Sequence, residues 1–284
     1  MKNQIKQLRK LAAFVAFAAT VGILLNACHK TGPLTKEEIP LDGEIKSVFI
    51  DGPWDVVIEQ NSGNNSAVIE YNVPKDKIVA YYYNNNGHLL IRVSSVGNYR
   101  NVVLRAKIAA ASLENIEASG AATIETYGQF QNATDISLTG ASKLKGFSCE
   151  GEFANIILSG ASKLEPFSFK GKRLEAVISG ASVLNLRKID VDYCTVNASG
   201  ASYFLGNGFA DRASFVGSGA STFSAFNVGT ANLDIDLSGA SYAEVNASQT
   251  IKGRLTGAST LKYRDIASLQ VQVEVDGDSK IKRE

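Results

Sequence analysis

The stretch from Asn155 to Leu164 reads NIILSGASKL, and its Ser-Gly-Ala-Ser centre recurs along most of the chain. The recurring glycines follow one another at intervals of 18 to 20 residues. They are Gly120, Gly140, Gly160, Gly180, Gly200, Gly219, Gly239, Gly257 and Gly277. Self-similarity at a period of this length indicates a repeat architecture, in which each copy packs on its neighbours.

Each copy alternates apolar and polar positions ahead of its glycine. Ala154, Ile156 and Leu158 are small or apolar, and the positions between them are mostly polar across the copies. This period of two predicts a half-buried strand. An apolar residue four positions after the glycine, such as Leu164, predicts a second short strand. The sequence therefore predicts an all-β fold, a right-handed parallel β-helix or β-solenoid with about 20 residues per turn, its hand following the usual crossover rule.

The glycine of each corner has two physical explanations. Either the turn requires a positive φ, or the stacked turns pass too closely to leave room for a Cβ atom. Two positions after the glycine stands Ala122 in the first copy and a serine in every later copy, from Ser142 to Ser279. These serines predict a hydroxyl ladder along the stack. The pattern does not say whether the ladder faces inward or outward, and we interpret the motif as structural.

The repeats occupy residues 109–284, and a different β segment precedes them at residues 44–108. In that segment Asp51-Gly52-Pro53 stands where the later copies have Ser-Gly-Ala, which suggests a diverged first turn. The runs Ala67 to Val73, Val79 to Tyr83 and His88 to Val93 predict antiparallel strands, the last two joined by a turn that ends in Asn-Gly. We expect these strands to form an N-terminal antiparallel β cap.

The first residues have the order of a secretory signal peptide. Basic residues from Lys2 to Lys10 precede an uncharged apolar run from Leu11 to Leu25. The run ends in Leu25-Asn26-Ala27-Cys28, which resembles the bacterial lipoprotein signal. A short transmembrane anchor and an ordinary signal peptide with a chance cysteine are the alternatives.

This resemblance implies removal of residues 1–27 and lipidation of Cys28. Residues 28–43 would then be the lipidated cysteine and a flexible tether, because they show no apolar period. His29 stands where an inner-membrane retention aspartate would be expected, so we predict an exported protein anchored in the outer membrane. Whether it faces the periplasm or the medium is open.

Candidate catalytic groups are few. The chain has two histidines, His29 and His88, so a multi-histidine metal site cannot form and a catalytic triad would rest on His88 alone. Acidic pairs occur in different registers of the repeat, which predicts solvated charges, with calcium binding as the alternative. The pairs are Asp190 with Asp192, Asp234 with Asp236, and Asp276 with Asp278. We predict no enzyme activity, no metal and no cofactor, and the net charge of +1 gives no reason to expect a nucleic-acid partner.

Cys149 and Cys194 are the remaining cysteines. They lie a little over two repeats apart, which corresponds to about 10 Å along a stack of strands. That separation exceeds the limit for a disulfide. We therefore predict two buried, free thiols.

Tyrosines supply the candidate ligand surface. Three consecutive residues, Tyr81, Tyr82 and Tyr83, cannot all enter one core, so at least one should be exposed and able to stack on a sugar ring. An aromatic packing layer under the cap is the alternative. Tyr203 and Tyr242 stand three positions after their glycines, in a column that also holds lysines and should be an exposed stripe.

The order of these features resembles one known family. A lipoprotein signal is followed by Val-Phe-Ile-Asp-Gly-Pro-Trp-Asp-Val-Val-Ile at residues 48–58, a hairpin region, and serial Ile-x-Leu-Ser-Gly-Ala-Ser-x-Leu copies. This order is similar to the putative autotransporter adhesin family with a head GIN domain, common in Bacteroidetes envelopes. The resemblance implies a β-helical fold and a role in adhesion.

We therefore predict a lipid-anchored, non-enzymatic cell-envelope β-solenoid that binds a glycan or a surface protein. A structural envelope component without a ligand is the alternative, and an enzyme acting on polysaccharide is a third, less favoured reading. The membrane would be a partner through the lipid anchor. The sequence leaves the ligand and the oligomeric state open.

Overall fold

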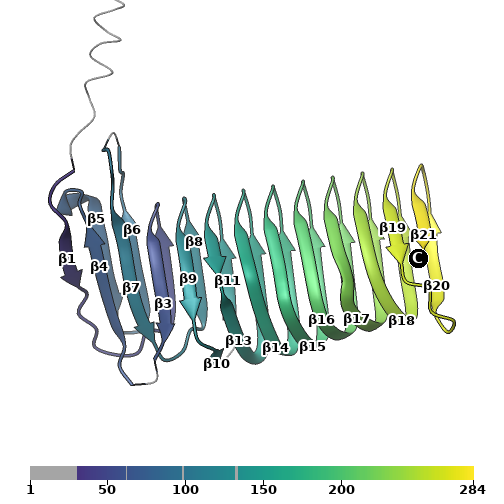
Figure 1. Cartoon of the computed structure of the whole chain (residues 1–284), viewed down its shortest axis with the longest axis horizontal. Helices are drawn as coiled ribbons and strands as arrows, with labels where there is room; N and C mark the ends of the chain where they lie inside the picture. Colours follow the sequence, from purple (N-terminus) through teal and green to yellow (C-terminus); the bar gives the residue numbers. More distant parts are fainter. Residues whose placement is uncertain (1–30, 62, 98, 132–133) are drawn as a thin grey trace, which may run out of the picture.

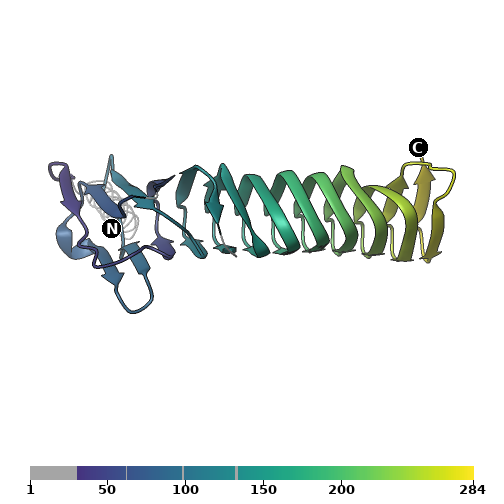
Figure 2. The same ribbon diagram turned by 90° about the horizontal axis from the view of Figure 1, so that it is seen from below.

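The computed structural model describes residues 31–61, 63–97, 99–131 and 134–284. Cys28 and the predicted signal peptide lie outside these residues. The described chain is built from strands and one short 3-10 helix, and it has no helix of the length and apolarity needed to cross a membrane. Figures 1 and 2 show a straight rod of stacked coils with a broader cap at its N-terminal end.

The cap comprises β1 (Thr35–Glu38), β2 (Ser47–Asp51), β3 (Asp55–Gln60), β4 (Ser66–Tyr71), the helix η1 (Lys75–Lys77), β5 (Ile78–Tyr83), β6 (His88–Val93) and β7 (Leu104–Ala110). The repeats form β8 (Asn115–Ser119), β9 (Thr123–Tyr127), β10 (Phe130–Gln131), β11 (Thr134–Leu138), β12 (Lys143–Lys145), β13 (Phe147–Leu158), β14 (Lys163–Ile178), β15 (Val183–Ala198), β16 (Tyr203–Gly217), β17 (Thr222–Leu237), β18 (Tyr242–Leu255), β19 (Thr260–Tyr263), β20 (Gln270–Val275) and β21 (Lys280–Arg283).

Successive repeats pair in parallel and nearly in register. Leu158 of β13 lies beside Ile178 of β14, which lies beside Ala198 of β15, so equivalent positions of the repeat form columns. The coils number about eight, each of about 20 residues. The predicted solenoid of parallel stacked coils is thus confirmed.

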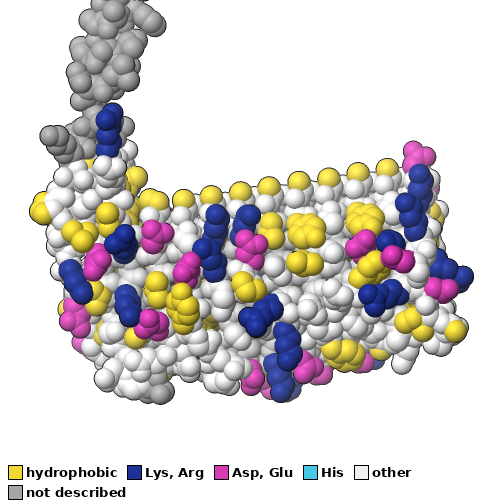
Figure 3. All heavy atoms as spheres, in the orientation of Figure 1, with side chains coloured by type: hydrophobic (Ala, Val, Ile, Leu, Met, Phe, Trp, Pro, Cys, Tyr) yellow, Lys and Arg dark blue, Asp and Glu magenta, His cyan; other side chains and the backbone are white. Residues whose placement is uncertain are grey.

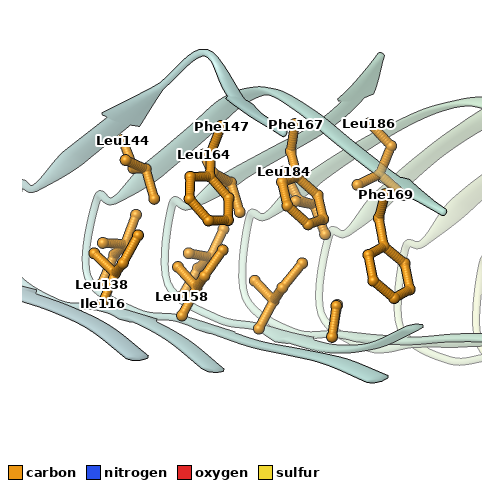
Figure 4. Packing of buried hydrophobic residues seen from close by; sticks show 14 of the residues in the cluster. Ile116, Leu138, Leu144, Phe147, Leu158, Leu164, Phe167, Phe169, Leu184 and Leu186 are labelled. Atoms are coloured by element: carbon orange, nitrogen blue, oxygen red, sulfur yellow. The ribbon is translucent and has the colours of Figure 1, made fainter. Parts of the chain in front are cut away.

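The core of the stack is a set of apolar columns. In β14 the inward alternation changes phase at Glu165–Pro166 and again between Phe169 and Leu174, and a third change of direction follows at the glycine corner. Each coil therefore bends around the core in three places. Figure 4 shows the resulting columns. Leu144, Leu164 and Leu184 form one of them, and Phe147, Phe167 and Leu186 form another.

Both explanations for the corner glycine hold. Gly180 has a φ of +72°, and a Cβ atom there would lie 2.4 Å from the carbonyl oxygen of Gly160 in the preceding turn. That carbonyl accepts a hydrogen bond of 2.7 Å from the amide of Ala181. The close contact between turns is therefore part of the backbone ladder itself.

The serine ladder faces inward, which answers the question that the pattern left open. The serines from Ser142 to Ser259 are buried. Several hydroxyls donate to a backbone carbonyl of their own corner, as Ser162 does to Ser159 at 2.6 Å. Because the ladder is enclosed, the second serine of the Ser-Gly-Ala-Ser corner offers its hydroxyl to the fold and not to a ligand.

The cap begins with the diverged first turn that the sequence predicted. β2 pairs in parallel with β8, and Gly52 lies against Gly120 in the corner. The hairpin of β5 and β6 is antiparallel, also as predicted. The sequence did not predict the stacking order. In the structure β2 lies between β6 and β8, and β3 lies between β7 and β9. The chain leaves its first coil, builds the end of the stack beyond it, and then returns to continue on the other side.

The segment predicted as a tether is partly folded. β1 lies within it and pairs antiparallel with β4. Ile39 is buried, and the amide of Gly32 donates to the carbonyl of Asn72 at 2.8 Å. The prediction of a flexible tether over residues 28–43 is therefore wrong from Gly32 onward. Short alternating runs with charged residues carry too little apolar signal to reveal an edge strand.

The two cysteines are buried thiols, as predicted. They occupy different columns, because Cys149 lies beside Phe169 and Cys194 lies beside Leu174. Burial raises the pKa of the Cys194 thiol to about 12. A thiol with so high a pKa is unreactive at neutral pH.

Candidate binding surface

Large apolar side chains lie on the outer face of the cap, where β5, β6 and β2 run side by side. Phe49, Val79, Tyr81, Tyr83, His88 and Leu90 make up this surface, which we call the aromatic patch. The register places Tyr81 beside Leu90 and Leu90 beside Phe49 in one row across the three strands. Tyr83 lies beside His88 in the next row. The patch is therefore a continuous surface made by neighbouring strands.

The rings of the patch are held by one another and by polar neighbours. The ring centroids of Tyr81 and Tyr83 are 4.6 Å apart in an edge-to-face arrangement, and those of Tyr83 and His88 are 6.0 Å apart. The guanidinium of Arg92 lies 5.6 Å from the Phe49 centroid. Its Nε atom is 2.8 Å from Asp51 Oδ2. Exposed ring faces thus adjoin hydrogen-bonding groups, a combination that suits an amphipathic ligand.

The three consecutive tyrosines divide between the two faces of β5. Tyr81 is 56% exposed and Tyr83 is 46% exposed, whereas Tyr82 is only 6% exposed. The Tyr82 hydroxyl donates to the carbonyl of Glu44 at 2.8 Å. Burial raises the pKa of Tyr82, with a further contribution from the charges of Asp42 and Glu44. Tyr82 therefore belongs to the core, and Tyr81 and Tyr83 to the surface.

Tyr203 and Tyr242 lie elsewhere on the molecule. They belong to the predicted stripe three positions after the glycine, which is exposed or half-buried along the stack. Thr222 separates them, so they are two turns apart, at about 10 Å. Tyr242 donates to Glu244 Oε1 at 2.7 Å, and burial together with this bond raises its pKa to about 12. The structure does not bring these two tyrosines to the aromatic patch.

A groove of about 770 Å³ lies on the other sheet of the cap. It is lined by residues of β1, β4, β7, β3 and β9, with Val57 and Val68 among them. One row across its strands runs Lys36, Glu70, Arg105 and Asp55, so the charges alternate in sign. Figure 3 shows charged side chains of both signs over this end of the molecule.

The charges of the groove largely compensate one another. Lys107 Nζ lies 3.1 Å from Glu59 Oε1, and Lys145 Nζ lies 2.9 Å from Glu125 Oε1 at the solenoid side. The hydrogen bond and the charge of Lys145 lower the pKa of the Glu125 carboxyl. Because these groups already have partners, a ligand would have to displace them. The ring faces of Tyr81 and Tyr83 in the aromatic patch can be contacted without breaking an ion pair, although Arg92 and Asp51 beside them are paired with each other. The aromatic patch is therefore the better candidate.

The acidic pairs of the repeats point into solvent. All six aspartates of the three pairs are exposed. Asp276 lies 3.4 Å from Arg254 and accepts a hydrogen bond from the amide of Gly277. Within the residues that the structure describes, no group of three or more histidine, cysteine or acidic side chains is placed to hold a metal ion.

Two members of the patch, Phe49 and Leu90, were not singled out from the sequence. Each is a large apolar residue at a position of its strand that faces solvent, where the later repeats carry Glu117 or Ser137. An apolar residue on the wet side of an alternating strand is the signal that could have found them. This signal was hidden because both strands also carry apolar residues on the core side, so each strand is apolar at most of its positions.

Comparison with known proteins identifies the family. The sequence profile described as "Putative auto-transporter adhesin, head GIN domain" matches residues 45–267. No curated protein sequence matches the chain.

Solved structures share the fold at low identity. A putative adhesin from Parabacteroides merdae is 18% identical with a TM-score of 0.64, covering 90% of this chain and 98% of its own. A putative lipid binding protein from Parabacteroides distasonis is 16% identical with a TM-score of 0.66, covering 90% and 99%. A putative adhesin from the same species is 15% identical with a TM-score of 0.63, covering 90% and 99%. The profile match spans most of the folded chain, and the chain therefore belongs to the putative auto-transporter adhesin family with a head GIN domain.

Proposed function

We propose that this protein is a non-catalytic binding module of the bacterial cell envelope, and that its aromatic patch contacts carbohydrate on another surface. The observation that carries the proposal is the exposure of Tyr81 and Tyr83 on a rigid sheet. Exposed tyrosines in a row are costly to leave against water, and they offer ring faces on which sugars stack. Arg92, Asp51 and His88 supply hydrogen-bonding groups beside them.

The family supports an adhesive role and a place at the cell envelope. One similar solved structure is described as a putative lipid binding protein, and an apolar patch would also accept a lipid chain. We favour carbohydrate because the patch is a flat sheet surface and not an enclosed cavity, which an acyl chain would need. Binding to glycan-free lipid vesicles would indicate that the ligand of the patch is a lipid.

The proposal includes a lipid anchor at Cys28 and export to the outer membrane. Its support is the sequence Leu25-Asn26-Ala27-Cys28 after an apolar run. Gly32 bonds to the cap through its amide, so an anchor at Cys28 would hold the cap within about 14 Å of the lipid surface. Loss of the protein from the membrane fraction on Cys28→Ser would support the anchor, and unchanged retention would exclude it.

We also propose that the protein catalyses no reaction on its ligand. His88 belongs to the aromatic patch and stands beside Tyr83, and no carboxylate is paired with it by a bond that the structure shows. The acidic pairs are solvated and fall in different registers, so they cannot flank one glycosidic bond. Release of reducing or unsaturated sugars from envelope polysaccharide would contradict this part.

The double variant Tyr81→Ser/Tyr83→Ser is expected to lose about ten- to a hundredfold in affinity for the bound carbohydrate. Two stacked aromatic rings contribute about 1–3 kcal/mol together, and each 1.4 kcal/mol corresponds to a factor of ten. The measurement is a glycan array followed by titration of the best ligand with the purified chain.

Tyr203→Ser is the matched control, because Tyr203 is also an exposed tyrosine of this protein but lies on the other sheet. It should bind as the wild type does. Equal loss in both variants would place the site elsewhere. A wild-type chain that binds no glycan and no cell would favour a structural role in the envelope, and binding confined to protein-coated surfaces would favour a protein ligand.

A further inference from the structure

Strand β5 is an open sheet edge of unusual composition. Within the described chain it pairs with β6 alone. Its residues, Ile-Val-Ala-Tyr-Tyr-Tyr, include no charge, proline or glycine. The other end strands all carry charge, because β1 has Lys36, Glu37 and Glu38, β21 reads Lys-Ile-Lys-Arg, and β20, which pairs with β18, has Glu274. Natural proteins use such charges to prevent pairing at edges, so an uncharged edge of six residues is a site where another strand adds.

The backbone groups that face outward from this edge can be assigned. The amide of Ser94 donates to the carbonyl of Lys77 at 2.8 Å, which places Lys77 in a hydrogen-bonded position opposite β6. In an antiparallel ladder such positions alternate. Val79, Tyr81 and Tyr83 therefore direct their backbone groups toward β6. Ile78, Ala80 and Tyr82 direct theirs to the open side. Among the described residues, the Ile78 amide alone has a partner there, the Lys75 carbonyl of η1.

The two ends of β5 differ in charge. Lys75 and Lys77 precede its first residue, but Lys75 is paired with Glu37 and Lys77 Nζ lies 3.8 Å from Asp76 Oδ2, so this end is close to neutral. Asp42 and Glu44 lie at its other end, where Asp42 accepts a hydrogen bond from Asn84 and the Glu44 carbonyl accepts one from Tyr82. A parallel copy of β5 would bring the two acidic ends together, whereas an antiparallel copy would place each acidic end beside the lysine-bearing end of the other. The charges at the edge thus favour the antiparallel orientation.

We propose that two copies of this chain pair through β5, antiparallel about a two-fold axis at Ala80. In this register the two Ala80 residues exchange hydrogen bonds, and each Tyr82 amide donates to the Ile78 carbonyl of the second copy. Among the antiparallel registries, this one places all three outward-facing residues of each copy opposite outward-facing residues of the other. Val79 then stands opposite Tyr81 of the second copy on the outer face.

The pairing would join two aromatic patches into one surface across the two-fold axis. This consequence rests on the proposed function, because it turns one carbohydrate contact into two on a single rigid sheet. Two contacts held in fixed geometry raise the effective affinity without any new interaction. The pairing itself depends only on the edge and its charges.

Cysteine cross-linking tests the register. Ala80→Cys places the two sulfur-bearing residues directly opposite each other, at a Cα separation of about 5.5 Å, which a disulfide can bridge. Val79→Cys is the matched control, because Val79 is 44% exposed but would lie about 8 Å from its own equivalent, offset by two residues. The full chain in its own membrane is oxidised and run on a non-reducing gel, with the wild-type chain as background.

We expect most of the Ala80→Cys chain to form a reducible dimer, and the Val79→Cys chain to remain monomeric. Equal cross-linking of the two variants would indicate random collision, and absence of cross-linking in both would show that the edge stays open. Either result overturns the proposal.

Charge exchange gives a second test on the detergent-solubilised full chain. Lys77→Glu is expected to weaken the dimer at least tenfold in sedimentation equilibrium, because it places like charges at both ends of the paired strands. Lys77→Glu combined with Glu44→Lys should restore the wild-type dissociation constant. Both side chains are at the surface, so the fold should tolerate the changes.

A wild-type chain that stays monomeric, or a charge exchange that restores nothing, contradicts the pairing. Dimerisation is measured without ligand. A monomer that binds glycans would therefore overturn this inference alone, whereas a dimer that binds none would overturn the proposed function alone.

Discussion

Replacing Phe167 with alanine is expected to lower the free energy of unfolding by about 3–5 kcal/mol. The Phe167 ring is fully buried and lies almost parallel to Phe147, with centroids 6.0 Å apart. Phe169 stands 6.4 Å away on the other side. Truncation would remove the contacts of one ring with its neighbours in the column and leave a cavity that the backbone ladder cannot close, since the turns above and below hold their spacing.

The measurement is unfolding of the purified chain in guanidinium chloride, followed by circular dichroism. Val177→Ala is the control, because Val177 lies in the same strand β14 but is 46% exposed on the outer face. It should change stability by less than about 0.5 kcal/mol. A loss below about 1 kcal/mol for Phe167→Ala would mean that the coils do not act as one packed core.

Gly180→Ala is expected to destabilise the protein by about 3 kcal/mol or more, although it adds a single methyl group. Part of the cost is conformational, because a residue with a Cβ atom pays about 1–2 kcal/mol in the left-handed region. The rest is steric. The new Cβ would lie 2.4 Å from the carbonyl oxygen of Gly160, which cannot move away without losing its hydrogen bond from Ala181.

Gly229→Ala is the matched control for the corner. Gly229 belongs to the same stack, but its nearest contact for a Cβ atom is 3.7 Å away, at a flexible ring, and its φ is not in the left-handed region. Alanine there should be neutral or stabilising by up to about 1 kcal/mol. Thermal and denaturant unfolding of both variants separate the two cases, and equal stabilities would refute the close-contact explanation of the repeat.

The repeat also explains why the binding surface lies in the cap. The corners from Gly140 to Gly257 use their glycine, their small residues and their inward serine to stack, so these positions are not available to vary. The cap has no copy on its outer side, and β5 ends the sheet there. An end of a solenoid is the place where ring-bearing strands and unpaired edges can be exposed together.

The repeated part of this fold could be predicted from the sequence because its signals are local and periodic. Alternation around Ile156 and Leu158, and the return of Gly160 every 20 residues or so, determine strand, corner and stacking at once. The spacing of Cys149 and Cys194 along the repeat also predicted that both are buried thiols. The inward direction of Ser162 could not be predicted, because a small polar residue beside a corner can face either way.

The candidate site could be predicted only in part. The run at Tyr81 drew attention by composition, and alternation within one strand required that some of its rings be exposed. Which of them form a surface, and with what neighbours, depended on β6 and β2 lying next to β5. Tyr203 and Tyr242 were grouped with them by residue type alone, and the structure separates them.

The sequence by itself thus determined the coil, its corner and its period, since residues that interact within a turn are near in the chain and recur in the next. Only the tertiary structure decided that β2 lies between β6 and β8, that β1 closes the tether onto β4, and that Phe49 and Leu90 complete the aromatic patch. These arrangements are contacts between segments that lie far apart in the sequence, and each of them occurs only once in the fold. A strand pairing that occurs once leaves no periodic pattern in the sequence. Tertiary packing selects which strands pair in such a case, and only the folded chain reveals that packing.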